Sequence, residues 1–157
     1  MPLPRSLLRM TPSELEDFLG SQRTCRIATV SEDGEPHVVP LWYVWHDGAL
    51  WVTSLRKSRR ASDLASGSRV AVCVDAGEAY SELKGAVLYG RFTSATEEPE
   101  LDAVRGLLGA KYWSGIQVPD VRSHTWLVLR PDRIVSWDFA KIPDGRDRRR
   151  EALREAE

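Results

Sequence analysis

Long hydrophobic runs are missing from this sequence of 157 residues. No stretch approaches the roughly 18 apolar residues that a membrane-spanning helix needs. The first ten residues, MPLPRSLLRM, contain no continuous apolar segment of the kind found in a signal peptide. We therefore expect a cytoplasmic protein with no membrane partner.

Cysteine, histidine and net charge are also scarce. Cys25 and Cys73 both fall in β-like runs, so we expect small buried side chains and not a disulfide framework. The three histidines are scattered and lack Cys or carboxylate partners at ligand spacing, which argues against a metal site. A formal net charge of -1 removes any global attraction to nucleic acid, so a basic function must be local.

The residues that are present suffice for one domain. Hydrophobic residues make up 42% of the chain, which at this length is enough for a single core. We expect the domain over residues 1–143. Residues 144–157 are almost all charged and are interpreted as a tail, frayed or disordered.

The first half of the sequence predicts a helix followed by three strands. In TPSELEDFLG, Thr11 is the expected N-cap, Pro12 the first helical residue and Glu14 the partner in a capping box. From residue 23 the apolar period becomes two, and the turns EDGE and HDG separate TCRIATV, PHVVPLWYVW and ALWVTS. These segments predict an antiparallel meander.

The second half predicts more strands, with helices inserted between them. A helix over KSRRASDLASG precedes the strand SRVAVCVD, another strand begins near residue 84, a helix covers 96–112, and WLVLRPDRIVSWDF closes the fold. About six strands at short spacing predict an α+β protein, an antiparallel six-stranded β-barrel with peripheral helices. Six tryptophans exceed what one small barrel interior holds, so we expect some at an interface or ligand site.

The stretch LWVTSLRKSRRASDL concentrates positive charge between a strand and a helix. Two strand-end hydroxyls and four cations occur here: Thr53, Ser54, Arg56, Lys57, Arg59 and Arg60. One interpretation is a solvated helix face, since exposed charges often do little. A nucleic-acid patch would need basic residues spread along a face with interleaved aromatics, which the chain does not supply. Hydroxyls, backbone N–H groups and guanidinium groups this close together favour a site for one phosphate.

Four blocks of the sequence carry a family resemblance. RIATVSEDGEPHVVPLWYVW, LWVTSLRKSRRASDLASGSRVAVCVD, ELKGAVLYGRF and RIVSWDFAKI resemble, in order and spacing, the pyridoxamine 5'-phosphate oxidase-like split barrels. The spacing is most similar to the flavin/deazaflavin oxidoreductases of the B group, and the likeness covers residues 11–141. It implies a homodimer whose cofactor lies in a groove at the dimer interface.

The resemblance assigns ten positions to the cofactor. They are Val38, Val39, Pro40, Thr53, Ser54, Lys57, Arg59, Arg60, Gly85 and Trp137. It implies that PHVVPL supplies the edge of the isoalloxazine-type ring site and that the strand end with SRR supplies the phosphate site. Gly85 falls where the pyridoxamine-phosphate oxidases carry a flavin-contacting glutamine. Trp137 matches a tryptophan that the partner subunit contributes in those oxidases.

The departures from the family bear on the reaction. Counterparts of the substrate-phosphate ligands and of the C-terminal Arg-Leu-His-Asp-Arg segment are absent, so vitamin B6 oxidation is not expected. The resemblance implies an oxidoreductase that transfers a hydride between F420 or FMN and a small conjugated or heteroaromatic substrate. The alternative is a non-catalytic flavin, deazaflavin or haem binding protein of the same fold.

Two questions about this chemistry stay open in the sequence. The basic cluster exceeds what one phosphate requires, and arginine outnumbers lysine 18 to 4, which together favour F420 over FMN by a small margin. No catalytic residue is identified. The candidates for proton donation near a reduced cofactor are Tyr80, Glu82, Tyr89 and Tyr112.

Overall fold

The computed structural model describes residues 5–96, 98–116, 119 and 122–142, and the predicted tail over 144–157 lies outside them. The described residues form three α-helices, three short 3-10 helices and eight strands. The helices are α1 (Pro12–Ser21), α2 (Arg59–Ala65), α3 (Glu98–Tyr112), η1 (Arg5–Leu8), η2 (Tyr80–Glu82) and η3 (Phe139–Lys141). The strands are β1 (Thr24–Val30), β2 (Pro36–Trp42), β3 (Val44–His46), β4 (Ala49–Leu55), β5 (Arg69–Ala76), β6 (Lys84–Ser94), β7 (His124–Leu129) and β8 (Arg133–Asp138).

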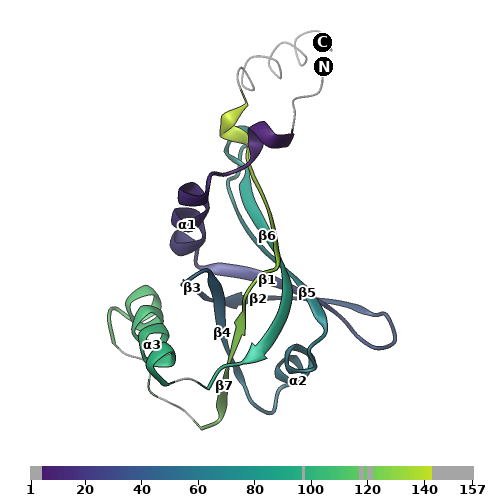
Figure 1. Cartoon of the computed structure of the whole chain (residues 1–157), viewed down its shortest axis with the longest axis vertical. Helices are drawn as coiled ribbons and strands as arrows, with labels where there is room; N and C mark the ends of the chain where they lie inside the picture. The colour runs from purple at the N-terminus through teal and green to yellow at the C-terminus, as the bar shows by residue number, and fades with distance from the viewer. Residues whose placement is uncertain (1–4, 97, 117–118, 120–121, 143–157) are drawn as a thin grey trace.

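The strands form one curled antiparallel sheet (Figure 1). Its order is β2-β1-β5-β6-β7-β4-β3, and β8 pairs with β6 outside this path. The long strand β6 joins two halves: residues 84–91 pair with β5 and β8, and residues 92–94 pair with β7. The predicted α+β split barrel is thus confirmed in its antiparallel curled sheet and its peripheral helices.

The expected number of six strands is wrong, because two segments interpreted as single strands each divide. PHVVPLWYVW breaks at Tyr43, whose buried hydroxyl donates to the Leu19 carbonyl at 2.6 Å and draws the chain into the core. The strands on either side of it then pair differently, β2 with β1 and β3 with β4. WLVLRPDRIVSWDF breaks at Pro131, which has no N–H to donate to a ladder.

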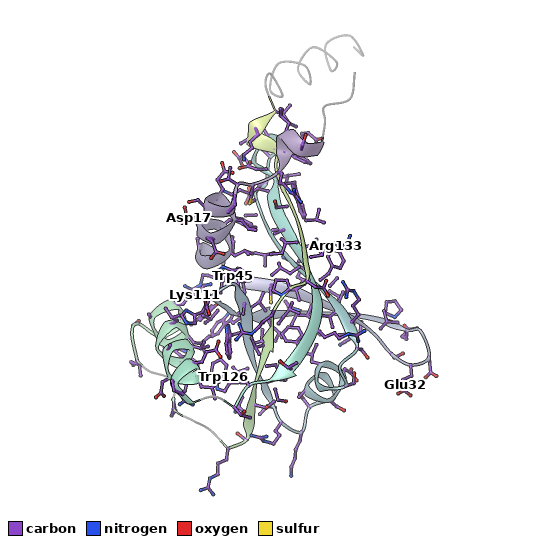
Figure 2. The ribbon with its side chains drawn as sticks, in the orientation of Figure 1. Asp17, Glu32, Trp45, Lys111, Trp126 and Arg133 are labelled. Atoms are coloured by element: carbon purple, nitrogen blue, oxygen red, sulfur yellow. The ribbon has the colours of Figure 1, made fainter. Side chains whose placement is uncertain are left out.

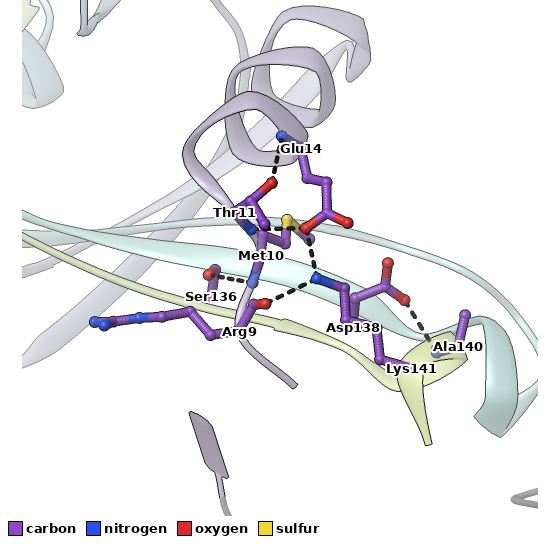
Figure 3. Close-up of polar contacts among 8 residues, drawn as sticks. All are labelled: Arg9, Met10, Thr11, Glu14, Ser136, Asp138, Ala140 and Lys141. Atoms are coloured by element: carbon purple, nitrogen blue, oxygen red, sulfur yellow. Dashed lines mark hydrogen bonds and ion pairs between the residues drawn. The ribbon is translucent and has the colours of Figure 1, made fainter. Parts of the chain in front are cut away.

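The predicted tight turn at HDG and the first helix are confirmed, whereas at EDGE the longer loop 31–35 joins the two strands. Asp47 and Gly48 both have positive φ, 48° and 66°, as a two-residue hairpin turn requires. At the start of α1 the Thr11 backbone N–H donates to Glu14 Oε2 at 2.6 Å, while Glu14 N–H donates to Thr11 Oγ1 at 3.3 Å. This reciprocal pair is the capping box that TPSE predicted (Figure 3).

The segment before α1 is attached to the end of the fold. Lys141 Nζ donates to the Arg9 carbonyl at 2.9 Å and pairs with Glu14 at 2.5 Å, and Met10 N–H donates to Ser136 Oγ at 3.2 Å (Figure 3). In Figure 1, η1 and η3 accordingly lie together at the top of the molecule. The first and last segments of the described chain therefore meet beside β8.

Apolar side chains pack in two clusters. The larger fills the curl of the sheet and includes Ile27, Leu88 and Leu127, each fully buried. The smaller lies between α3 and the sheet and includes Val104 and Leu108 of α3 together with Trp126 of β7. Figure 2 shows Trp126 on the sheet beside α3. This second cluster fixes α3 on the outer face of the barrel. Among the described residues, no helix is long and apolar enough to cross a membrane.

Candidate functional site

A cavity of about 550 Å³ lies where β2, β4, β7 and α3 meet. Its lining residues are Thr24, Pro40, Leu41, Trp42, Thr53, Leu108, Trp113 and His124. Two predicted cofactor residues, Pro40 and Thr53, are far apart in sequence and are brought together here. The remaining lining is mostly apolar and aromatic, which is usual for a small-molecule site.

Two exposed aromatic rings line this cavity. Trp42 and Trp113 are 51% and 42% exposed, although both are large apolar side chains. The ring of Trp42 stacks on Tyr112 with centroids 4.5 Å apart and planes inclined by 14°. The Arg23 guanidinium lies over the Tyr112 ring, 4.7 Å from its centroid. Trp42 and Trp113 line the cavity, and the expectation that some tryptophans lie at a ligand site stays a prediction.

Tyr112 is held by backbone groups. Its hydroxyl lies 2.5 Å from the Arg23 carbonyl oxygen and 2.8 Å from the Tyr43 carbonyl oxygen, and it accepts the Tyr43 N–H at 3.2 Å. Burial raises the pKa of Tyr112. A hydroxyl so engaged and so weakly acidic serves to position the ring, so Tyr112 is a poor candidate for the proton donor that the sequence left open.

Lys111 lies beside the rings of Tyr43 and Tyr112. Its ammonium is 4.4 Å from the centroid of the Tyr43 ring and 3.4 Å from the Tyr43 carbonyl oxygen. Burial, followed by the neighbouring Arg23 guanidinium, lowers the pKa of Lys111 to about 8. Arg23 and Lys111 therefore place positive charge beside Tyr112, the ring on which Trp42 stacks, and neither of them lines the cavity.

The strand predicted to hold the ring edge, β2, is one of the edge strands that the described residues form. β2 pairs with β1 on one side and ends the strand order. Pro40 lines the cavity, Val39 is half-buried, and Val38 is 59% exposed. Proline is tolerated at this position because an edge strand can dispense with one ladder donor.

The two predicted hydroxyls differ in their surroundings. Thr53 lines the cavity, whereas Ser54 is 2% exposed and its Oγ lies 3.1 Å from Ser58 Oγ. Ser58 in turn caps α2 by accepting the Ala61 N–H at 3.1 Å. Thr53 is thus placed to contact a ligand. Ser54 is buried and contacts Ser58, so it stabilises the loop between β4 and α2.

The four cations of the basic stretch are also not equivalent. Arg56 donates to the carbonyl oxygens of His124 at 3.0 Å and Arg122 at 3.4 Å, so it ties the loop to the start of β7. Lys57 is exposed at the loop. Arg59 and Arg60 are the first residues of α2, and their side chains lie outside the described part of the chain.

Gly85 and Trp137 are brought together at a different place. They are register partners on β6 and β8, and a second cavity of about 590 Å³ lies beside Trp137. The lining of this cavity is Ser6, Leu8, Arg9, Val135, Ser136, Trp137 and Phe139. Within one chain, Pro40 and Thr53 therefore line one cavity and Trp137 lines another.

Sequence reasoning missed six of the eight residues that line the first cavity, among them Trp42, Trp113 and His124. Trp42 could have been found, because it follows Pro40 by two positions and so shares its face of β2. Trp113 and His124 carry no such signal, since each comes from a distant segment. Within the described residues, no group of three His, Cys, Asp or Glu side chains could hold a metal ion.

The fold and the cavity at the edge of its sheet define a split-barrel protein. Residues 11–138 match the family model described as pyridoxamine 5'-phosphate oxidase. The chain belongs to this family, and the resemblance inferred from its four sequence blocks is confirmed. No protein with curated annotation matches the sequence.

Solved structures with the same fold include three from bacteria. A conserved hypothetical protein from Mycobacterium tuberculosis is 27% identical, with a TM-score of 0.78, over 90% of this chain and 94% of that one. A FAD and haem binding protein from Mycobacterium smegmatis is 20% identical, with a TM-score of 0.72, over 90% and 78%. A FAD-binding protein from Mesorhizobium loti is 22% identical, with a TM-score of 0.64, over 81% and 94%.

Proposed function

We propose that this protein is an oxidoreductase that binds a flavin-type cofactor, F420 or FMN, and transfers a hydride between it and a small conjugated or heteroaromatic substrate. The observation that carries the proposal is the meeting of Pro40 and Thr53 in one apolar cavity of a split barrel. These positions come from separate strands and were both assigned to the cofactor by the sequence resemblance.

The residues present fit a flat, largely apolar ring. Pro40 and Leu41 offer flat apolar surface, Thr53 offers a hydroxyl, and the cavity of about 550 Å³ is large enough for a ring system and a second small molecule. The protein's part would be to orient the ring against β2 and to exclude water from its reactive face. The bound group itself would supply the hydride chemistry.

The phosphate of the cofactor would lie at the loop after β4. Lys57, Arg59 and Arg60 are the cations we assign to it. Arg56 is engaged with two backbone carbonyls, so one of the four cations that favoured F420 has a structural role. The margin in favour of F420 over FMN accordingly narrows, and the proposal includes both.

The complete site would require two copies of the chain. β2 exposes Val38 at an edge of the sheet, and the second cavity beside Trp137 is flanked by exposed Leu7 and Val135. Apolar surface of this kind on a monomer is typical of an interface. In the proposed homodimer, the Trp137 of the partner subunit would complete the site that Pro40 and Thr53 begin.

A titration of cofactor-free protein with F420 and FMN in parallel tests the proposal. Trp42 and Trp113 line the cavity, so saturable quenching of tryptophan fluorescence at micromolar cofactor is expected. Substrate-dependent reoxidation of the reduced cofactor would then separate an enzyme from a carrier. Absence of binding by both cofactors would sink the proposal.

A haem binding protein is the second candidate. The Mycobacterium smegmatis structure with this fold is described as a FAD and haem binding protein, and His124 lines the cavity here. Its Nδ1 lies 3.1 Å from Ser123 Oγ, which would fix the ring orientation of an axial ligand. Added haem should then give a sharp Soret band that His124→Ala abolishes and Ser123→Ala retains in weakened form.

A further inference from the structure

We infer that the α3 side of the first cavity is a stacking site for a neutral, planar aromatic molecule, held between Trp42 and Trp113. Its role as the substrate site rests on the proposed function, in which the cofactor ring occupies the side of Pro40 and Thr53. The stacking site itself depends only on the walls of the cavity. Nothing in the family match assigns either tryptophan.

One wall of the site is ordered before any ligand binds. Trp42 is stacked on Tyr112, and Tyr112 is covered by Arg23 on its ring and fixed at its hydroxyl by backbone groups. This column of three side chains holds the half-exposed indole in one orientation. A planar ligand would therefore meet a preorganised surface and lose little free energy in ordering it.

The other wall is positioned by the end of α3. Leu101, Val104 and Leu108 anchor this helix on the sheet. Trp113 is the next residue after the helix, and its N–H donates to the Gly109 carbonyl at 2.9 Å. Gly115, with φ of +87°, returns its N–H to the same carbonyl at 3.0 Å. The turn thus ends the helix and places Trp113 on the cavity.

The charge around the cavity selects a neutral molecule. Among the described residues that line it there is no Asp, Glu, Lys or Arg. An anion there would be desolvated without a cation in direct contact, because Arg23 and Lys111 are not among the lining residues and act only across the Trp42 and Tyr112 rings. A cation would stack well on indole, but Arg23 and Lys111 lie beside Tyr112 and oppose it. Thr24, Thr53 and His124 leave hydrogen-bonding capacity for one polar substituent.

Three bicyclic aromatic probes of similar size and different charge test this inference. We would titrate full-length protein by calorimetry with 2-naphthol, which is neutral at pH 7, with 2-naphthoate and with N-methylquinolinium, each with and without saturating cofactor. We expect 2-naphthol to bind in both conditions and to bind at least tenfold more tightly than either charged probe.

Four variants locate the binding. Trp42→Ala and Trp113→Ala should each weaken 2-naphthol binding about tenfold, which corresponds to about 1.4 kcal/mol. Trp42→Phe and Trp113→Phe should restore most of it, because a flat ring is retained. Trp45→Phe is the control: Trp45 is half-buried on β3, donates to Glu16 at 2.6 Å, and does not line the cavity.

Several results would overturn the inference. Equal affinity for charged and neutral probes would contradict the charge argument, and wild-type affinity in both alanine variants would contradict the site. Displacement of 2-naphthol by F420 or FMN would assign the whole cavity to the cofactor. If neither cofactor binds while 2-naphthol binding depends on both tryptophans, the stacking site stands and the proposed function fails.

Discussion

The indole ring of Trp137 lies directly over Gly85, so closely that a β-carbon at position 85 would be 2.5 Å from Cζ2 of the ring. The same β-carbon would be 2.8 Å from the Val74 carbonyl oxygen, on the strand at the other side of β6. The side chain at Trp137 therefore occupies the space that a longer residue at position 85 would need. Glycine is required here by close packing.

Gly85→Ala should lower the free energy of unfolding by about 1 to 3 kcal/mol, because the ring and a backbone carbonyl must both give way. Urea denaturation measures the change. Gly20→Ala is the matched control, since nothing lies within 4 Å of a β-carbon there and alanine favours a helix. Equal stabilities of the two variants would show that Trp137 moves aside freely.

Lys57 and Arg56 should differ in what they contribute. Lys57→Ala should weaken binding of F420 or FMN by about 1 to 3 kcal/mol, the value of a charge-assisted bond, and leave stability unchanged. Arg56→Ala should lower stability by about 1 to 2 kcal/mol, because two carbonyl oxygens lose their donor. Fluorescence titration and urea denaturation of both variants check the contrast. A reversed pattern would place the phosphate at Arg56.

Cys25 should make the protein less stable in alkali. Burial raises the pKa of this thiol from about 9 to about 12. Between these values the unfolded chain loses the proton and the folded chain keeps it, so the unfolded state binds fewer protons and stability falls as pH rises. Below pH 9 both states are protonated and this contribution is constant.

Urea midpoints from pH 7 to pH 10.5 test the effect of Cys25. Cys25→Ala should be less stable at pH 7 by about 1 to 2 kcal/mol, because of the cavity it leaves, but should lose less stability toward pH 10.5. Cys73→Ala is the control, since Cys73 is only half-buried and should change the slope less. If Cys25→Ala loses stability between pH 7 and pH 10.5 as steeply as the wild type, the Cys25 thiol is not the source of the alkaline instability.

Val38 should contribute to the proposed dimer. A lysine on an exposed edge strand opposes association with another chain. Val38→Lys should therefore shift the protein from the mass of two chains to that of one in light scattering at micromolar concentration. Leu107→Lys, at an exposed position of α3, is the control and should remain dimeric. A dimeric Val38→Lys would place the interface elsewhere.

Local sequence signals predicted the elements of this fold well. The capping box of Thr11 and Glu14, the turn at Asp47 and Gly48, and the period of two in the strands each depend on residues close in sequence. The strand count failed where a tertiary contact decided the outcome. The burial of Tyr43 against Leu19 divides a continuous apolar run, and no local pattern announces that contact.

The candidate site was less predictable because it is assembled from distant segments. Position in the family blocks placed Pro40 and Thr53 at one site, and the structure brings them together. The roles of Ser54 and Arg56 depend on partners at Ser58, Arg122 and His124, so their engagement could not be foreseen from a cluster of charge and hydroxyls. Trp113 reaches the cavity only through the packing of α3.

β6 pairs both with a strand that precedes it in the sequence and with strands that follow it, and this affects folding during synthesis. β5 precedes β6 and can pair with it at once, whereas β7 and β8 follow only after α3. β4 likewise pairs with β7, although α2, β5, β6 and α3 lie between these two strands in the sequence. Proteins dominated by such non-local strand pairing fold in roughly milliseconds to seconds. We expect ribosome-bound chains that end before residue 124 to expose open strand edges and to bind chaperones more than the complete chain does.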